Sequence, residues 1–199
     1  TEGSKSSGSL GIGASLALNI ANITALAEVA DNALLIGANN LTLSADSITS
    51  ARTYSTAGGE AGGGKGVGIG GAISLTVANN DTRADIGSGS PLTIGGNFSA
   101  TATHNGTTAT LADAAASGGA AAVGIALGLN VALDDTLATT NREIIAGGDV
   151  TFAASTISKS SSDAKASAAG AKGEEPAAED GSGGTPKNGV DQQVGDHRG

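Results

Sequence analysis

The chain has 199 residues and a net charge of −9, with ten Lys or Arg against nineteen Asp or Glu. This acidic balance excludes the basic patch on which DNA, RNA or an anionic membrane surface would bind. The absence of cysteine excludes a disulfide framework and any cysteine metal site. Glycine accounts for 33 residues, whereas there are only one tyrosine and two phenylalanines, so any core must be built from Leu, Ile, Val and Ala.

One alternating stretch occurs three times along the chain, at 10–20, 67–77 and 121–131. Large apolar residues take every second position, and Gly, Ala, Ser, Asn or Thr take the positions between them. A period of two is typical of β-strands, because successive side chains point to opposite faces. We expect the large side chains to face the core. Aligned copies then form inner ladders, of which two are Leu16–Ile73–Leu127 and Leu18–Leu75–Leu129.

The small residues of these strands predict an unusually flat second face, with Gly11, Gly13 and Ser15 as examples from the first copy. A wet sheet face usually carries long polar side chains. We therefore interpret the small positions as a surface that another sheet or chain can approach closely.

The third copy lies in an apolar stretch, 114–133, that is near the length of a membrane-spanning helix. Ser117, Asn130 and the abundance of Gly and Ala argue against a membrane span, as does the strand alternation. We also expect no helix elsewhere, because Gly is dense and no capped apolar stripe of helical period occurs.

Asn and Asp follow each copy, at 21–24, 78–87 and 132–136, and these residues favour turns. The segment 104–106, His-Asn-Gly, has the same character. We expect all four segments to be turns.

A second landmark, a Gly/Asn turn that leads into an alternating strand, also occurs three times, at 36–45, 94–100 and 146–153. The copies are offset by roughly 52–57 residues. We place the repeat units at about 9–64, 65–120 and 121–157, within a β-repeat region of 1–158.

Similar units at regular spacing favour stacking, because each unit buries its face on the next. The sequence therefore predicts an all-β, repetitive β-solenoid (β-helix-like) with Gly/Ala-rich strands. An antiparallel β meander or sandwich is the alternative. Residues 159–199 break the repeat grammar with charged, small and Pro-bearing segments, and we interpret them as a polar, partly disordered linker or loop.

Two groups of residues imitate functional motifs. The stretch 59–66 resembles a phosphate-binding loop, but Gly66 replaces the Ser or Thr that would hold magnesium. Five acidic residues in the expected turns could in principle ligate calcium, although the nonapeptide pattern of calcium β-rolls is absent. These residues are Asp81, Asp85, Asp134, Asp135 and Asp149.

The two histidines, His104 and His197, have no nearby candidate nucleophile in the sequence, and no Ser occupies a strand-to-helix elbow. We therefore predict a protein that is not an enzyme. We assign no catalytic residue, no cofactor-binding residue, no cofactor and no metal ligand.

The combination of 67–82 with the segment 94–98, Ile-Gly-Gly-Asn-Phe, resembles the repeat region of large bacterial filamentous adhesins of the leukotoxin-like and filamentous-haemagglutinin-like kind. The acidic break that ends in 190–194, Val-Asp-Gln-Gln-Val, is similar to spacers in those proteins. The resemblance covers most of 9–157. It implies export across a Gram-negative envelope, an extracellular or cell-surface location, and a β-solenoid stalk for attachment or filament formation.

The expected function is therefore a structural, non-catalytic segment of an extracellular adhesin or fibre. Its partners are neighbouring repeats of the same long chain, copies of itself in fibres, and a glycan on a host or another surface. The alternative is a binding module that takes glycan, calcium or ice through its turns and flat strand faces. The polar residues 1–8 carry no export signal, and we interpret the chain as an internal piece of a longer protein.

Overall fold

The computed structural model describes residues 4–6 and 9–170, and within them the chain forms strands, turns and loops without a helix. The described strands are β1 (Ser4–Ser6), β2 (Leu10–Val29), β3 (Leu41–Ala61), β4 (Val67–Ile86), β5 (Leu92–Ile94), β6 (Phe98–Gly118), β7 (Ala121–Thr140), β8 (Ile144–Ala146) and β9 (Val150–Ala169).

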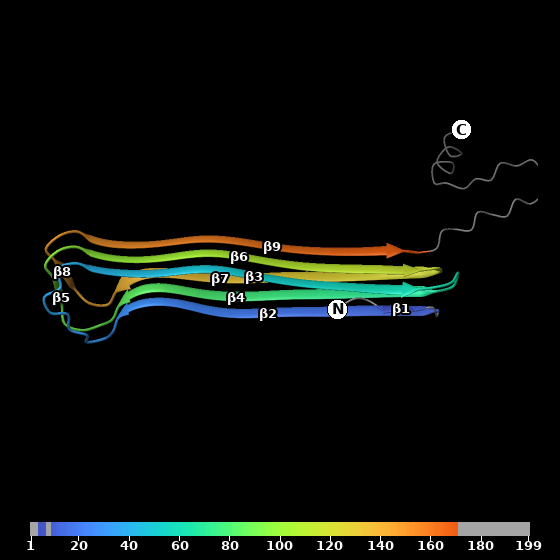
Figure 1. Ribbon diagram of the computed structural model, residues 1–199, viewed down its shortest axis with the longest axis horizontal. Helices are drawn as coiled ribbons and strands as arrows, with labels where there is room; N and C mark the ends of the chain where they lie inside the picture. The colour runs from blue at the N-terminus through green and yellow to red at the C-terminus, as the bar shows by residue number, and fades with distance from the viewer. Residues whose placement is uncertain (1–3, 7–8, 171–199) are drawn as a thin grey trace, which may run out of the picture.

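The strands form three successive rungs of a solenoid (Figure 1). In each rung a long strand runs the length of the molecule, a turn reverses the chain, and a second long strand returns beside it. The outgoing strands make the β2–β4–β7 sheet, and the returning strands make the β3–β6–β9 sheet, which β1 joins at the edge of β3. The short strands β5 and β8 pair at the turn end. Twenty residues of strand span about 65 Å.

All pairings between rungs are parallel and in register along the long strands. Leu16 pairs with Ile73 and Ile73 with Leu127, so the expected alignment of the three copies is confirmed. The parallel ladders confirm the β-solenoid and exclude the antiparallel meander or sandwich for the described residues.

The third unit is a complete rung, because β9 continues to Ala169. The expected boundary at 158 therefore falls inside a strand and is wrong for residues 159–169. These polar residues are held by backbone pairing with β6, from Thr107 paired with Lys159 to Ser117 paired with Ala169. The rest of the expected linker, 171–199, lies outside the described residues, as does the break at 190–194.

Most of the expected Asx turns are also wrong. Residues 21–24, 78–86 and 132–136 continue the strands β2, β4 and β7, and 104–106 lies inside β6. The parallel ladder pairs every one of these residues, for example Asn80 with Asp134, and this pairing overrides the local preference of Asn and Asp for turns. The Gly/Asn landmarks do form turns before β3, β6 and β9.

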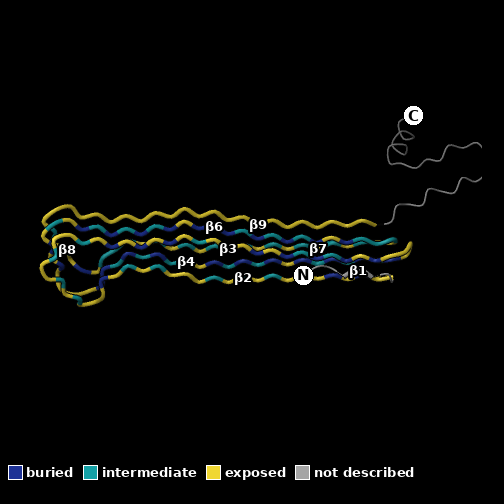
Figure 2. The backbone as a smooth tube through the Cα atoms, in the orientation of Figure 1, coloured by how far each residue is buried: buried dark blue, intermediate teal, exposed yellow. Residues whose placement is uncertain are grey.

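The expected orientation of the large residues is reversed. Leu16 and Leu127 on the β2–β4–β7 sheet are 73% and 55% exposed, whereas the buried positions hold small residues such as Ala72, Ser74 and Thr76. Buried residues alternate with less buried ones along β4 and β6 (Figure 2). The large side chains point outward because the two sheets approach too closely to hold them between their inner faces.

The interior is wide at the turn end and narrow at the other. A cluster of large apolar side chains fills the turn end, where Phe98, Ile86 and Ile94 are buried and the Phe98 ring lies 5.2 Å from that of Phe152. The narrow end contains mainly Ala, with Ala57, Ala72, Ala112 and Ala114 in one cluster. Buried Ser, Thr, Asn and His side chains occupy the stretch between them.

The two sheets are staggered. Each inner strand packs against two strands of the opposite sheet, as β4 does against β3 and β6. The last strand, β9, packs against β7 alone, and every one of its residues is exposed (Figure 2).

Candidate functional site

The interface between the two sheets is closed by backbone atoms at its narrow end. A Cβ at Gly13 would overlap the carbonyl oxygen of Gly58, and a Cβ at Gly70 would overlap the carbonyl oxygen of Ala115. Only glycine fits where a facing strand comes this near. The flat face expected from the sequence is therefore used for close approach, and its partner is the second sheet of the same chain.

A chain of buried hydroxyl groups links the sheets further along. Thr110 Oγ1 donates to Thr76 Oγ1 and Thr76 Oγ1 donates to Thr53 Oγ1, each at 2.6 Å. The Ser74 hydroxyl donates to the Leu111 carbonyl oxygen at 2.6 Å and lies 2.7 Å from Ser55 Oγ. These hydrogen bonds satisfy hydroxyls that the close packing removes from water.

The buried acid–base pair consists of His104 on β6 and Asp134 on β7. His104 Nε2 lies 3.2 Å from Asp134 Oδ1, and Asn80 Nδ2 donates to the same oxygen at 2.6 Å. Burial alone would raise the pKa of Asp134, but hydrogen bonds from Asn80 and Ser158, together with His104, outweigh burial and lower that pKa. The His104 side chain is fully buried, and that of Asp134 is 8% exposed. The geometry serves to join the two sheets.

Asn and Asp side chains connect successive rungs at the turn end. Asn40 Oδ1 accepts from the backbone N–H of Asn97, and Asn97 Oδ1 accepts from that of Asp149. Asp31 accepts from the backbone N–H and the hydroxyl of Ser88, and these hydrogen bonds lower the pKa of Asp31. Each rung thus holds the turn of the next in place.

Arg142 joins all three rungs, and the sequence analysis did not predict this role. Its guanidinium is buried in the turn end and donates to three carbonyl oxygens, those of Gly87, Ala33 and Ala30, at 2.6, 2.8 and 2.8 Å. A lone arginine near the end of an alternating strand gives no sequence signal for such contacts, because its acceptors are backbone atoms more than fifty residues away.

The outer surface of the β2–β4–β7 sheet carries the most distinctive feature of the molecule. Six consecutive rows across the three strands contain only apolar residues and glycine, and we name these eighteen outward positions the apolar face. The rows are Leu10–Val67–Ala121, Ile12–Ile69–Val123, Ala14–Gly71–Ile125, Leu16–Ile73–Leu127, Leu18–Leu75–Leu129 and Ile20–Val77–Val131.

The apolar face is hollowed along its third row. Ala14 and Gly71 are short there, and they leave a hollow of about 490 Å³ whose lining includes Leu16, Ile73 and Ile125. No atom lies within 4 Å of where a Cβ at Gly71 would be, which confirms that this position opens outward.

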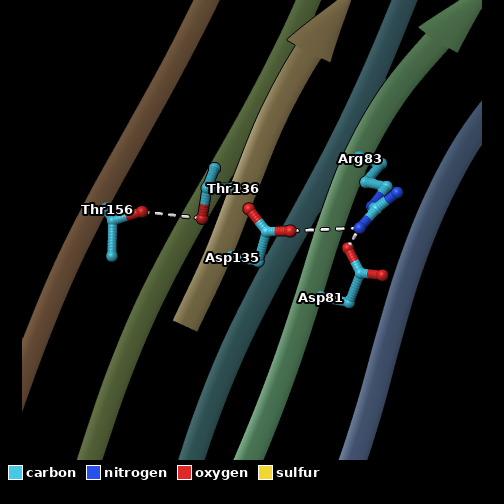
Figure 3. Close-up of polar contacts among 5 residues, drawn as sticks. All are labelled: Asp81, Arg83, Asp135, Thr136 and Thr156. Atoms are coloured by element: carbon cyan, nitrogen blue, oxygen red, sulfur yellow. Dashed lines mark hydrogen bonds and ion pairs between the residues drawn. The ribbon is translucent and has the colours of Figure 1, made fainter. Parts of the chain in front are cut away.

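Charged residues appear on this sheet only beyond the apolar face. Arg83 on β4 pairs with Asp81 of the same strand and with Asp135 of β7, at 2.5 and 3.0 Å (Figure 3). These ion pairs raise the pKa of Arg83, chiefly through the hydrogen bond with Asp81. Beside them, Thr156 Oγ1 donates to Thr136 Oγ1 at 2.6 Å and links β9 to β7 (Figure 3).

The residues considered for phosphate and calcium lie elsewhere in the fold. Gly59 lies near the end of β3, against the backbone of Ile69. The strand β4 follows the stretch 59–66, where a phosphate-binding loop needs a helix. Asp81 and Asp135 pair with Arg83, and Asp134 is buried beside His104. Among the described residues, no three His, Cys, Asp or Glu side chains gather in a way that could hold a metal ion.

Of the two histidines, His104 is placed above, and His197 lies outside the described residues. Asp85 is part of β4, and Asp149 lies in the turn before β9. In the part of the chain that the structure describes, no helix is long and apolar enough to cross a membrane.

We compared the chain with family models, curated proteins and solved structures. No family model, no curated protein and no solved structure matches it. The proposal below therefore rests on the arrangement of the described strands alone.

Proposed function

We propose that the chain is a structural, non-catalytic segment of an extracellular bacterial adhesin or fibre. The observation that carries this proposal is the in-register stacking of long parallel strands, with like residues above like residues in successive rungs. Each added rung extends the two sheets by one strand spacing, about 4.8 Å, without changing their cross-section. Such a unit builds length and a stiff, flat surface.

The interior supports the same proposal. Several of its polar side chains form contacts between sheets and rungs, as Thr76, Asp134 and Arg142 do. Attachment or filament formation at the surface of a Gram-negative bacterium is the biological setting that fits a rigid element of this kind.

Immunogold electron microscopy of the producing bacterium tests this function. Antibodies raised against the purified chain should label filaments or projections at the outer surface of intact cells. Label that appears only after the cells are broken open would contradict the proposal.

A binding module remains the second candidate, and one observation favours it. The outer surface of the β3–β6–β9 sheet carries rows of hydroxyl side chains near the turn end, such as Thr42–Ser99–Thr151. Flat rows of this kind offer hydrogen-bonding groups to a glycan. A glycan array probed with the labelled chain tests this candidate, and reproducible binding that is lost when Thr42, Ser99 and Thr151 are changed to Val would favour it.

A further inference from the structure

The two outer surfaces of the solenoid differ in chemistry. Opposite the apolar face, the β3–β6–β9 sheet shows solvent rows such as Ser50–Thr107–Lys159 and Thr56–Asp113–Lys165. Mixed polar and charged residues are normal for a wet sheet face. The apolar face has no charged, hydroxyl or amide side chain at any of its eighteen positions.

The extent of the apolar face exceeds what a monomer normally exposes. Ten of its large side chains are between 44% and 73% exposed, and they are Leu10, Ile12, Leu16, Leu18, Ile20, Ile73, Val123, Ile125, Leu127 and Leu129. With the smaller contributions of the remaining positions, they offer on the order of 800 Å² of apolar surface. The largest apolar patch on a typical monomer is about 300–600 Å².

We propose that the apolar face is the interface between two copies of this chain, packed face to face. The area supports a second copy as the occupant, because a stable protein–protein interface buries about 800 Å² on each partner. Two flat faces of this kind form a sandwich whose inner layer is the conventional apolar core that each copy lacks along its strands.

Shape and charge complement the area. In a two-fold pair the same patch contacts itself, so it must carry both projections and depressions. The hollow over Ala14 and Gly71 lies between the side chains of Leu16, Ile73 and Ile125, which project to fill the hollow of a partner. The net charge of −9 does not oppose this contact at short range, since the face itself carries no charge.

Ile73 occupies the centre of the apolar face. It lies on the middle strand, β4, and in the fourth of the six rows. A two-fold axis through the middle of the face brings Ile73 near its own copy, whether the partner strands run parallel or antiparallel. This inference does not depend on the proposed role in an adhesin, because it concerns association of the chain alone.

Analytical ultracentrifugation of the full 199-residue chain tests the proposal. The wild-type chain should sediment as a dimer at micromolar concentration. The double variant Ile73→Lys/Leu127→Lys should raise the dimer dissociation constant by at least about 100-fold, because it places lysines against lysines in an apolar contact. A monomeric wild-type chain would overturn the proposal, and flotation of that monomer with phosphatidylcholine vesicles would identify lipid as the occupant instead.

The matched control makes the same change on the opposite surface. Ile48 and Ile157 share one row of the β3–β6–β9 sheet and are 87% and 55% exposed. Ile48→Lys/Ile157→Lys should leave the dimer intact. Assemblies that persist in Ile73→Lys/Leu127→Lys would show contact elsewhere, for example through strand edges, and would also overturn the proposal.

Disulfide cross-linking tests the same contact without the lysine substitutions, so it does not depend on the stability of those variants. The chain contains no cysteine, so a single introduced thiol is unique. Ile73→Cys should form a covalent dimer under mild oxidation, and Ile48→Cys should not. Equal cross-linking of the two variants, or none in either, would contradict face-to-face packing.

Discussion

The backbone carbonyl oxygen of Ala115, on β6, occupies the space that a Cβ of Gly70, on β4, would require. The neighbouring residue Gly71 points the other way, into open space. Two adjacent glycines of one strand therefore face a closed interior and an open exterior.

Gly70→Ala should destabilise the chain by at least about 3 kcal/mol, because neither sheet can move at one position without disturbing the ladder. Gly71→Ala should be neutral or stabilising by up to about 1 kcal/mol, since a glycine within a strand is entropically unfavourable. Thermal unfolding followed by circular dichroism measures both. The melting temperatures of the two variants should differ by on the order of 10 °C, and equal melting temperatures would contradict the difference between the two glycines.

Arg142→Ala should cost about 3 kcal/mol or more of stability, because three buried carbonyl oxygens lose their donor. Denaturant unfolding gives the value. The control is Arg52→Ala at an exposed position of β3, which should leave the unfolding midpoint nearly unchanged. Similar midpoints for the two variants would mean that Arg142 does not hold the rungs together.

Thr76→Val keeps the shape of the side chain but removes the central link of the Thr110–Thr76–Thr53 hydroxyl chain. The loss of stability should be about 1–3 kcal/mol, because Thr110 and Thr53 lose a buried partner. Thr107→Val makes the same change on the outer face of β6 and is the matched control. Unfolding curves that coincide for the two variants would argue against a hydroxyl chain between the sheets.

The pH dependence of stability should report the buried pair of His104 and Asp134. The pKa of Asp134 is lowered from its ordinary value of 3.8, so its carboxylate stabilises the folded chain at pH values above that figure. This contribution is lost as the pH falls from 3.8 through the lowered pKa, because the unfolded chain binds a proton there more readily than the folded chain does. Melting temperatures measured from neutral pH down to strong acid should therefore fall less steeply in Asp134→Asn than in the wild-type chain. Parallel curves for the two proteins would contradict a lowered pKa at Asp134.

The architecture could be predicted from the sequence because the repeats and their spacing determine which residues pair between rungs. The alignment of Leu16, Ile73 and Leu127 follows from the shared spacing of the three copies, and parallel stacking follows from it. Turn prediction succeeded where Gly and Asn occur together, as before Leu41 and Phe98.

The sequence did not predict which face of the β2–β4–β7 sheet lies inside. The rule that large apolar residues are buried assumes a partner surface with room for them. Here the returning strands also alternate small residues, with Ala57, Ala112 and Ala114 among them, and two small faces can close on each other. A comparison of the small residues in both long strands of a rung could have indicated that the two small faces pack together.

The polar strand segments were wrongly predicted to be turns for a related reason. Asn80 favours turns locally, but its neighbour in the ladder, Asp134, accepts a hydrogen bond from it, and His104 contacts the same carboxylate from the opposite sheet. Contacts of this kind join residues from different rungs and cannot be read from a local window. The same holds for Arg142, whose three acceptors are carbonyl groups of two other rungs.

Thiol alkylation at two adjacent residues of β4 tests whether the large apolar side chains of the β2–β4–β7 sheet point outward. Ser74 is fully buried and Ile73 is 44% exposed, so Ile73→Cys should react far faster than Ser74→Cys in solutions dilute enough for the chain to be monomeric. We expect the two rates to differ by at least about 100-fold, because the buried thiol reacts only after the structure opens locally. Faster reaction at Ser74→Cys would mean that the large residues lie inside and the small residues outside.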